Sequence, residues 1–422
     1  MEEYKVTAEG VGIIPEGVTE IAELAFENRS DLESIVIPEG VTVINDNAFY
    51  ECVNLKSVSI PNSVTTIGRY AFCNCVGLTD ITIPESVKLI DNAAFYGCDN
   101  LKDIVIPDGV THLGSDAFAY CEKWEHLVIP KSVTQIDGSF YACNFKSIKV
   151  DSENPVYDSR NNCNAIIKTE RNELVKGCDA THLPDDIEII GEFAFEGCRS
   201  FVKIILPRSI RVIYEYAFEN CINLESVFIP KEVIHVGETI FWGCKKLTNI
   251  VVEEGNPAYD SRNSCNAIIE TNENELVATC VTTVIPESVT AIARGAFEYC
   301  DIESIDIPEG VEIIEYSTFK DCEKLTDVKL PDSLNKIMCS AFDSCKSLTH
   351  ITIPKNVEMI DFLAFNKCES LQKVVFEGCV EEIDSFAFVA CDALKSIVVP
   401  KGKVDFYKHR FFEMYHDKIE EA

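Results

Sequence analysis

Proline recurs every 23 residues along most of this chain, and that period limits the folds open to it. The repeated prolines are Pro15, Pro38, Pro61, Pro84, Pro107, Pro130, Pro184, Pro207, Pro230, Pro308, Pro331 and Pro354. A 23-residue unit is too short for two packed helices and too long for a hairpin, but it suits one coil of a strand-containing solenoid. Because each coil lays its strand beside the previous one, we predict a right-handed solenoid with a parallel β-sheet, mostly β and irregular.

The repeated pattern around each proline is PxxVxxIxxxAFxxCxxLxxIxI, as in residues 61–83. Its LxxIxI segment is rich in β-branched residues, and its last two apolar positions alternate, which predicts a strand whose intervening residue faces outward. Proline follows directly and cannot donate to a sheet ladder, so we expect each strand to end there. The next turn often contains Gly, Asn or Asp, as at Asn45, Gly68 and Gly114, and these residue types tolerate a left-handed backbone.

Two longer coils interrupt the period at residues 151–184 and 253–286, and their sequences are nearly copies of one another. They share the sequence NPxYDSRNxCNAII. We expect each to carry a hairpin, with strands in the first one near residues 165–169 and 173–176. The DSR triplets that begin at Asp158 and Asp260 offer one carboxylate per loop, which is few for calcium. A turn held by a local Asp–Arg contact is therefore the preferred interpretation.

The repeat stops after Pro400. Beyond it, apolar residues recur at steps of three and four, namely Val404, Tyr407, Phe411, Tyr415 and Ile419. This spacing predicts an amphipathic helix whose apolar stripe covers the last coil. We therefore expect one solenoid of sixteen coils, fourteen short and two long, over residues 1–400, and a capping helix over residues 401–422.

Cysteine and phenylalanine each keep one position in the repeat. Thirteen of the 20 cysteines share theirs: Cys52, Cys75, Cys98, Cys121, Cys143, Cys198, Cys221, Cys244, Cys300, Cys322, Cys345, Cys368 and Cys391. Stacked side chains in register run parallel, and an odd-numbered column cannot pair completely, so we predict buried, reduced thiols that pack as small apolar groups. The phenylalanine that follows alanine in most coils is predicted to form a core ladder rather than an aromatic binding stripe.

Charge and motifs exclude several classes of function. The net charge of −33 repels nucleic acid and anionic membrane surfaces, and no run of 18 apolar residues predicts a membrane-spanning helix. No HExxH motif, phosphate-binding glycine loop or catalytic triad can be read from the sequence, so we expect no cofactor, no metal site and no enzymatic activity. Met1–Gly10 is acidic and has no basic region followed by an apolar core, so we expect no secretory signal in it.

The candidate partner-binding surface lies along the outward strand positions, two residues before each proline or the residue that takes its place in the repeat. Four consecutive members of this series are apolar and two polar residues bound them: Ile205, Phe228, Val251, Val284, His182 and Asp306. Exposed apolar groups ringed by polar groups are typical of docking surfaces. β-Branched residues also favour strands for purely structural reasons, and this second interpretation stays open.

These repeats resemble the leucine-rich repeats of the BspA-like bacterial surface-antigen family, whose unit carries the same proline, Ala-Phe and Cys signature. The resemblance covers residues 11–400. It implies a leucine-rich-repeat superhelix and a cell-surface or secreted protein that binds host or matrix proteins, with no catalytic residues to transfer. We therefore expect a non-enzymatic adhesion scaffold that recognises a partner protein through the solenoid face. The alternative is an intracellular structural or effector-like interaction scaffold in the cytoplasm, since no signal is expected and the thiols are predicted to be reduced.

Overall fold

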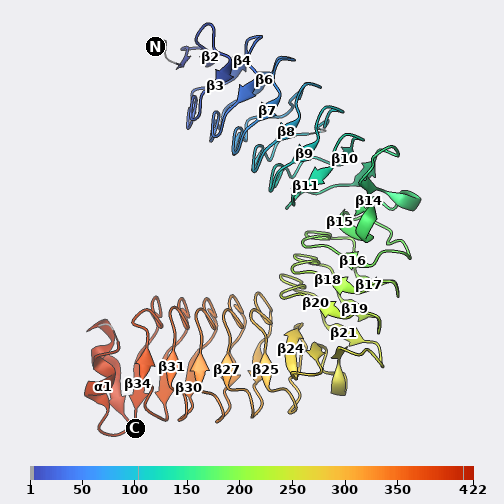
Figure 1. The fold of residues 1–422 in the computed structure, drawn as a ribbon. Coiled ribbons are helices and arrows are strands. Elements are labelled where there is room, and N and C mark those ends of the chain that lie inside the picture. Colours follow the sequence, from blue (N-terminus) through green and yellow to red (C-terminus); the bar gives the residue numbers. More distant parts are fainter. Residues whose placement is uncertain (1–3, 103, 412) are drawn as a thin grey trace. The chain divides into compact units, whose positions relative to one another are not determined.

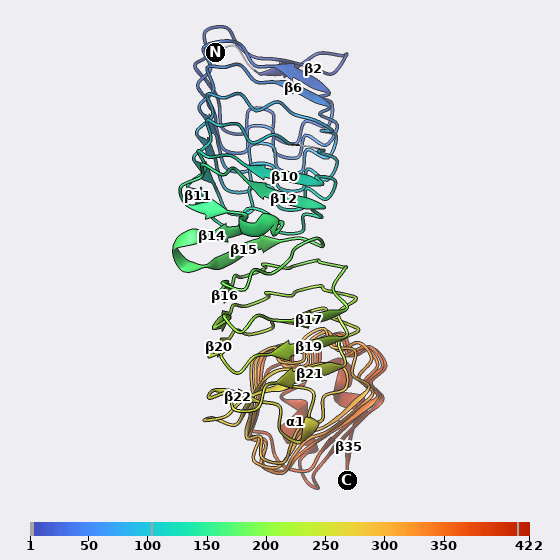
Figure 2. The ribbon, with the colours of Figure 1, turned by 90° about the vertical axis from the view of Figure 1, so that its right-hand side faces the viewer.

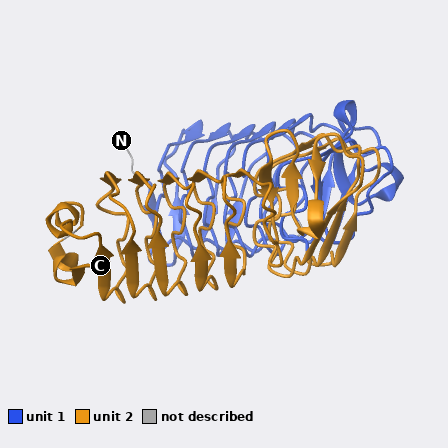
Figure 3. Ribbon diagram, turned by 90° about the horizontal axis from the view of Figure 1, so that it is seen from below, with its two compact units in different colours: residues 1–198 blue, residues 199–422 orange. Residues whose placement is uncertain are grey.

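The computed structural model describes residues 4–102, 104–411 and 413–422, and the chain divides into two compact units, residues 1–198 and 199–422 (Figure 3). Each unit is built of stacked coils whose strands lie side by side in parallel (Figures 1 and 2). Both are therefore parallel β-solenoids of the predicted class, and the repeat region extends over the two units. The first three residues of Met1–Gly10, for which no secretory signal is expected, lie outside the described residues.

Two ladders of parallel strands run through unit 1. The strands of the LxxIxI ladder are β2 (Val11–Ile13), β4 (Ser34–Val36), β6 (Ser57–Ser59), β10 (His126–Ile129) and β12 (Ser147–Val150), and β1 (Lys5–Val6) pairs antiparallel with β2. The second ladder consists of two-residue strands, β3 (Glu20–Ile21), β5 (Val43–Ile44), β7 (Thr66–Ile67), β8 (Leu89–Ile90), β9 (His112–Leu113) and β11 (Gln135–Ile136).

Unit 2 repeats this arrangement. Its LxxIxI strands are β17 (Lys203–Ile205), β19 (Ser226–Ile229), β21 (Asn249–Val252), β26 (Ser304–Asp306), β28 (Asp327–Lys329), β30 (His350–Ile353), β32 (Lys373–Phe376) and β34 (Ser396–Val399). Its two-residue strands are β18 (Val212–Ile213), β20 (His235–Val236), β25 (Ala291–Ile292), β27 (Ile313–Ile314), β29 (Lys336–Ile337), β31 (Met359–Ile360) and β33 (Glu382–Ile383).

The strand registers follow the sequence period. Ile35 pairs with Val58 in unit 1, and Ile351 pairs with Val374 in unit 2, each across 23 residues. The predicted LxxIxI strands and their parallel pairing are thus confirmed for most coils, although the residues between Leu78 and Pro84 form no strand. The second ladder was not predicted, because a two-residue strand leaves no alternating pattern to detect.

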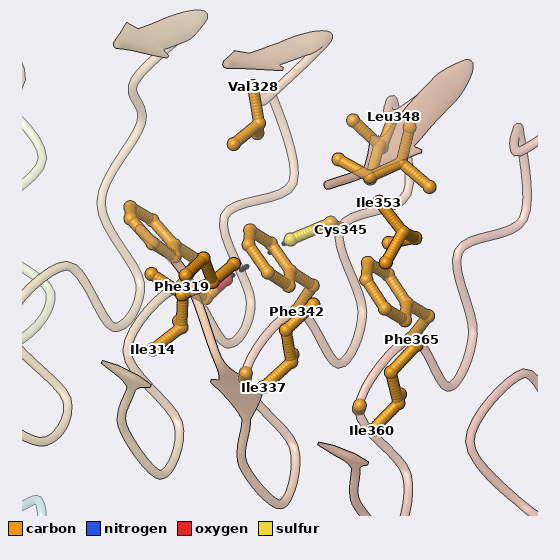
Figure 4. Close-up of a cluster of buried hydrophobic side chains, with 14 of the residues drawn as sticks. Ile314, Phe319, Val328, Ile337, Phe342, Cys345, Leu348, Ile353, Ile360 and Phe365 are labelled. Atoms are coloured by element: carbon orange, nitrogen blue, oxygen red, sulfur yellow. Dashed lines mark hydrogen bonds between the residues drawn. The ribbon is translucent and has the colours of Figure 1, made fainter. Parts of the chain in front are cut away.

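The core of each unit consists of columns of buried apolar side chains, and Figure 4 shows some of those in unit 2. In unit 2 the buried rings of Phe319, Phe342 and Phe365 stack with centroids 5.1 Å apart and nearly parallel planes. A large ring at the same place in every coil fills each layer to the density of a protein interior. The predicted phenylalanine core ladder is therefore confirmed.

The cysteine column packs against this ladder. All 20 cysteines are free thiols, and the Cys345 Sγ donates to the Phe319 carbonyl of the preceding coil at 3.1 Å (Figure 4). Nine further thiols repeat this hydrogen bond, those of Cys52, Cys75, Cys98, Cys121, Cys143, Cys244, Cys322, Cys368 and Cys391. Burial raises the pKa of Cys52 and that of Cys143 to about 12, so these groups pack as neutral thiols.

The glycines of the corner turn serve a different purpose from the one predicted. Gly68 and Gly114 do not have positive φ; the left-handed residues lie two positions later, for example Tyr70 and Asp116. A Cβ on Gly68 would approach the Ile44 carbonyl oxygen of the previous coil to 2.9 Å. Glycine is therefore needed there for close packing of adjacent coils rather than for a left-handed backbone.

Each long coil carries the expected hairpin. In unit 1, β14 (Ala165–Lys168) and β15 (Glu173–Gly177) pair antiparallel, β13 (Tyr157–Asp158) flanks β14, and β15 runs parallel to β16 (Ile189–Ile190). In unit 2 the hairpin is formed by β23 (Ile268–Glu270) and β24 (Glu275–Ala278), flanked by β22 (Tyr259–Asp260) and β25. Short 3-10 turns lie at Arg160–Asn162, Thr169–Arg171 and Arg262–Ser264. The hairpin prediction is confirmed at both of its strands in unit 1.

An arginine fixes each hairpin, as the Asp–Arg interpretation of the DSR triplet predicted. Arg160 Nη2 lies 2.8 Å from Asp158 Oδ2, and Arg262 Nη2 lies 2.6 Å from Asp260 Oδ2. The same guanidinium of Arg160 donates to Asn172 at the tip of the hairpin, at 3.0 Å. Each carboxylate is therefore used within its own turn.

We predict that Tyr259→Phe lowers the free energy of unfolding by about 1–2 kcal/mol, because a buried amide would lose its acceptor. The Val236 N–H donates to the hydroxyl of Tyr259 at 3.0 Å, and both residues are buried. Urea unfolding followed by circular dichroism measures the change. Tyr70→Phe is the control, because Tyr70 is exposed; an equal loss in both variants would contradict the assignment.

The C-terminal segment caps the last coil with less helix than predicted. The helix α1 covers only Val404–Lys408, a 3-10 helix covers Glu413–Lys418, and β35 (Ile419–Glu421) then pairs in parallel with β34. The expected apolar stripe does enter the core, since Tyr407, Phe411, Tyr415 and Ile419 are buried there. A continuous helix over residues 401–422 would leave the backbone of β34 unpaired, whereas β35 satisfies those groups.

Candidate functional site

Three of the six predicted site residues form a continuous apolar column on the outer face of unit 2. Ile205 pairs in register with Phe228, and Phe228 pairs with Val251, across β17, β19 and β21. The exposed fractions of Ile205 and Val251 are 64% and 37%, and Phe228 is half-buried. We call Ile205, Phe228 and Val251 the strand-face column.

Polar residues border this column on both sides. On one side, two residues earlier on each strand, lie Lys203, Ser226 and Asn249. On the other side Arg208 bridges two carboxylates, with Glu253 at 2.5 Å and Glu232 at 3.4 Å. An apolar centre inside a polar rim is the usual anatomy of a protein-binding surface.

Hydrogen bonds keep part of this rim charged. The Lys231 N–H donates to Glu253 at 3.1 Å. This amide and the Arg208 guanidinium hold the pKa of the Glu253 carboxyl below its ordinary value, because both favour the ionised form. The rim therefore holds its carboxylate in a defined orientation beside the apolar column.

The other three predicted residues do not continue the column in one sheet. Val284 is 70% exposed but belongs to no strand, and its N–H donates to the Cys265 carbonyl oxygen at 3.1 Å. Asp306 is exposed in β26 and pairs with Lys329 of β28. His182 is exposed in unit 1, where its Nδ1 lies 2.8 Å from the Ala180 carbonyl oxygen. The long coil interrupts the strand ladder before Val284. The spacing of the repeat in the sequence could not show this interruption.

A cavity of about 510 Å³ in unit 1 was missed by the sequence analysis. It lies between the corner turn that contains Tyr141, the hairpin strand β15 and the next corner turn at Phe193. Its walls include the aromatic rings of Phe140, Tyr141, Tyr157 and Phe193 together with several charged side chains. Cavities of this size and mixed lining are typical of small-molecule sites.

A buried ion pair stands in the wall of this cavity. Lys176 Nζ lies 3.3 Å from Glu196 Oε2, and both side chains are almost fully buried. The Ala142 N–H also donates to Glu196 Oε2, at 2.8 Å. The sequence held one signal for this site: Lys176 of the first long coil is replaced by Ala278 in the second.

Comparison with known families decides the classification. The family described as BspA type leucine rich repeat region matches six copies, over residues 19–146, 175–272 and 290–416. The chain belongs to this BspA-type family. No curated protein matches the chain.

Solved structures similar to this BspA-type chain are also leucine-rich repeat proteins. One from Eubacterium ventriosum is 24% identical, with 86% of this chain and 91% of that chain covered and a TM-score of 0.56. A leucine rich cell surface protein from Faecalibacterium prausnitzii is 24% identical, with 96% and 94% covered and a TM-score of 0.45. A leucine-rich repeat protein from Bacteroides ovatus is 26% identical, with 100% and 99% covered and a TM-score of 0.38. The first of these likenesses shows that the fold is shared.

Two further properties of the BspA-type chain bear on its chemistry. Within residues 4–102, 104–411 and 413–422, no three His, Cys, Asp or Glu side chains gather so that they could hold a metal ion. In the same part of the chain, no helix has the length and apolar character needed to cross a membrane. What the described residues do offer is a repeat scaffold with an exposed sheet face.

Proposed function

We propose that this BspA-type protein is a non-enzymatic scaffold that binds a partner protein on the strand-face column of unit 2. The observation that supports this proposal is the register that aligns Ile205, Phe228 and Val251 on adjacent strands. Repeat solenoids use such extended faces for partners, and a half-buried aromatic between two exposed aliphatic residues is the kind of anchor that dominates binding energy. The partner would insert an apolar side chain over Phe228 and meet the polar rim with hydrogen-bonding groups.

We further propose that the partner is a host or matrix protein and that the chain acts at the cell surface or after secretion, as an adhesin. Its support is the family and its likeness to bacterial leucine-rich repeat proteins, one of which is described as a cell surface protein. An intracellular interaction scaffold is a second candidate, favoured by the 20 free thiols. Antibody labelling of intact and of permeabilised cells separates the two, because an adhesin is labelled without permeabilisation.

Replacing the central aromatic tests the docking surface. We expect Phe228→Asp to weaken capture of the full-length protein on an array of extracellular-matrix proteins by about tenfold or more, because a charge would replace the anchor. Val375→Asp is the matched control: Val375 occupies the same repeat position on β32 of the same unit and is half-buried.

Thermal unfolding must show that both variants remain folded. The column is supported as the docking surface if an array protein binds the wild type and Val375→Asp but no longer binds Phe228→Asp. Equal binding by all three proteins, or equal loss in both variants, contradicts it.

A further inference from the structure

The cavity of unit 1 has no counterpart in the second long coil, although the two coils are near copies. There the equivalent space is only about 30 Å³. Trp242 replaces Tyr141 at the matching position, two residues before the cysteine, and its ring packs on Tyr299 with centroids 4.2 Å apart. Phe193 is likewise replaced by Gly295. The repeat can therefore close this space with a single large ring, and the first long coil keeps it open.

One buried donor of the cavity wall lacks acceptors. The Lys176 ammonium carries three N–H donors, and its only hydrogen-bond partner among the described residues is Glu196. The second coil has Ala278 at this position. Because Glu196 already neutralises the ammonium charge, the remaining donors call for neutral oxygen acceptors; a second carboxylate would place like charge beside Glu196.

The second polar group of the cavity wall is the Asp116 carboxylate, an acceptor that receives no hydrogen bond from the described residues. Asp116 is exposed, and within the described part of the chain its carboxylate makes no hydrogen bond or ion pair with another side chain or with the backbone. Partial burial raises the pKa of this carboxyl, and no donor or cation opposes that effect. A ligand hydroxyl that donates to Asp116 would stabilise the ionised form, since hydrogen bonds to charged groups are the stronger ones.

The apolar part of the wall is aromatic. The rings of Tyr141 and Phe193 meet edge to face with centroids 5.2 Å apart, and Phe140 lies on the same turn as Tyr141. Aromatic rings offer large, rigid surfaces on which the C–H face of a cyclic polyol can pack. A hydroxyl group can donate and accept at once, so a polyol in the cavity would offer a donor to the Asp116 carboxylate and an acceptor to the Lys176 ammonium, both of which line it.

We propose that the cavity beside the first hairpin is a carbohydrate-binding site that takes one neutral sugar unit, held by Asp116 and Lys176 against Tyr141 and Phe193. The site lies wholly in unit 1 and is independent of the strand-face column. It gives the scaffold a second recognition function, directed at glycan rather than at protein.

Saturation-transfer NMR on the full chain tests this assignment. The probes are glucose, galactose, mannose and N-acetylglucosamine at millimolar concentration, with free lysine and free arginine as alternative probes. We expect transfer to at least one sugar and none to the two amino acids. Tyr141→Trp copies the residue of the second coil and should abolish the signal by filling the space. Asp116→Asn should raise the sugar dissociation constant by about tenfold or more, because a charged acceptor is lost.

Asp321→Asn is the matched control. Asp321 also has positive φ and a carboxyl pKa raised by burial, but it follows the column residue Phe319 and does not line the cavity. The Asp321→Asn variant should bind sugar as the wild type does. The melting temperatures of all variants verify that they are folded. The proposal is overturned if no sugar of the panel shows transfer, if lysine or arginine binds instead, or if Tyr141→Trp binds sugar as the wild type does.

Discussion

Raising the pH above 9 is expected to unfold this chain steeply, with most of its stability lost before pH 12. Burial raises the thiol pKa from its ordinary value of 9.0 to about 12 at Cys52 and Cys143, and well above 9.0 at Cys75, Cys121, Cys322 and Cys368. The folded chain therefore keeps these protons while the unfolded chain releases them above pH 9, so stability falls as pH rises. Each such thiol costs about 1.4 kcal/mol per pH unit in this window. Urea unfolding at a series of pH values measures the effect.

Removing three thiols gives the control for this effect. Cys322, Cys345 and Cys368 are consecutive members of the column in unit 2, and all are fully buried. The triple alanine variant should be less stable than the wild type at pH 8, because three buried sulfurs are lost. Its free energy of unfolding should then fall less steeply above pH 9, by about 4 kcal/mol per pH unit in total. An unchanged slope would mean that other groups cause the alkaline transition.

Phe342→Ala is expected to cost about 4 kcal/mol of unfolding free energy. Its ring is fully buried and stacks on both Phe319 and Phe365, so truncation removes buried apolar surface, leaves a cavity and breaks two ring contacts. Each coil of a solenoid contacts only its neighbours, so the loss should be concentrated in unit 2. Hydrogen exchange of the strand amides in β28, β30 and β32 locates it, with protection falling most there.

Phe362→Ala is the matched control for that variant. Phe362 lies on the next coil of the same unit but is 44% exposed. We expect it to cost less than about 1 kcal/mol. A comparable loss in both variants would show that the phenylalanine column is not the main support of the unit.

The repeat made the fold predictable because it fixed both the strand and the side that faces the core. Ile305, Phe319 and Cys345 could each be assigned to the interior from position alone, and each is buried. The outward positions were equally well defined, as the exposure of Ile205 shows. Identical residues at a constant period become neighbours in space when the coils stack in register.

The repeat could not predict the cavity or the end of the strand-face column, because both depend on single residues or segments that depart from the repeat. The cavity lies where Tyr141 and Lys176 differ from their counterparts in the second long coil, Trp242 and Ala278. Val284 does not continue the strand-face column, because the long coil interrupts the pairing of the strands. The repeat pattern describes what the coils share, whereas a binding site depends on the residues in which one coil differs from the others.

Strand β35 determines how the end of the solenoid meets other molecules. As the outermost strand of its sheet it places Glu420 beside Val398 and Glu421 beside Val399. Two adjacent carboxylates on an edge strand repel the same edge of another copy, which blocks growth of the sheet into a fibre. A chain shortened before Val404 would instead present the unpaired backbone N–H and C=O groups of β34, and these would pair with the first strand of another copy to build a filament.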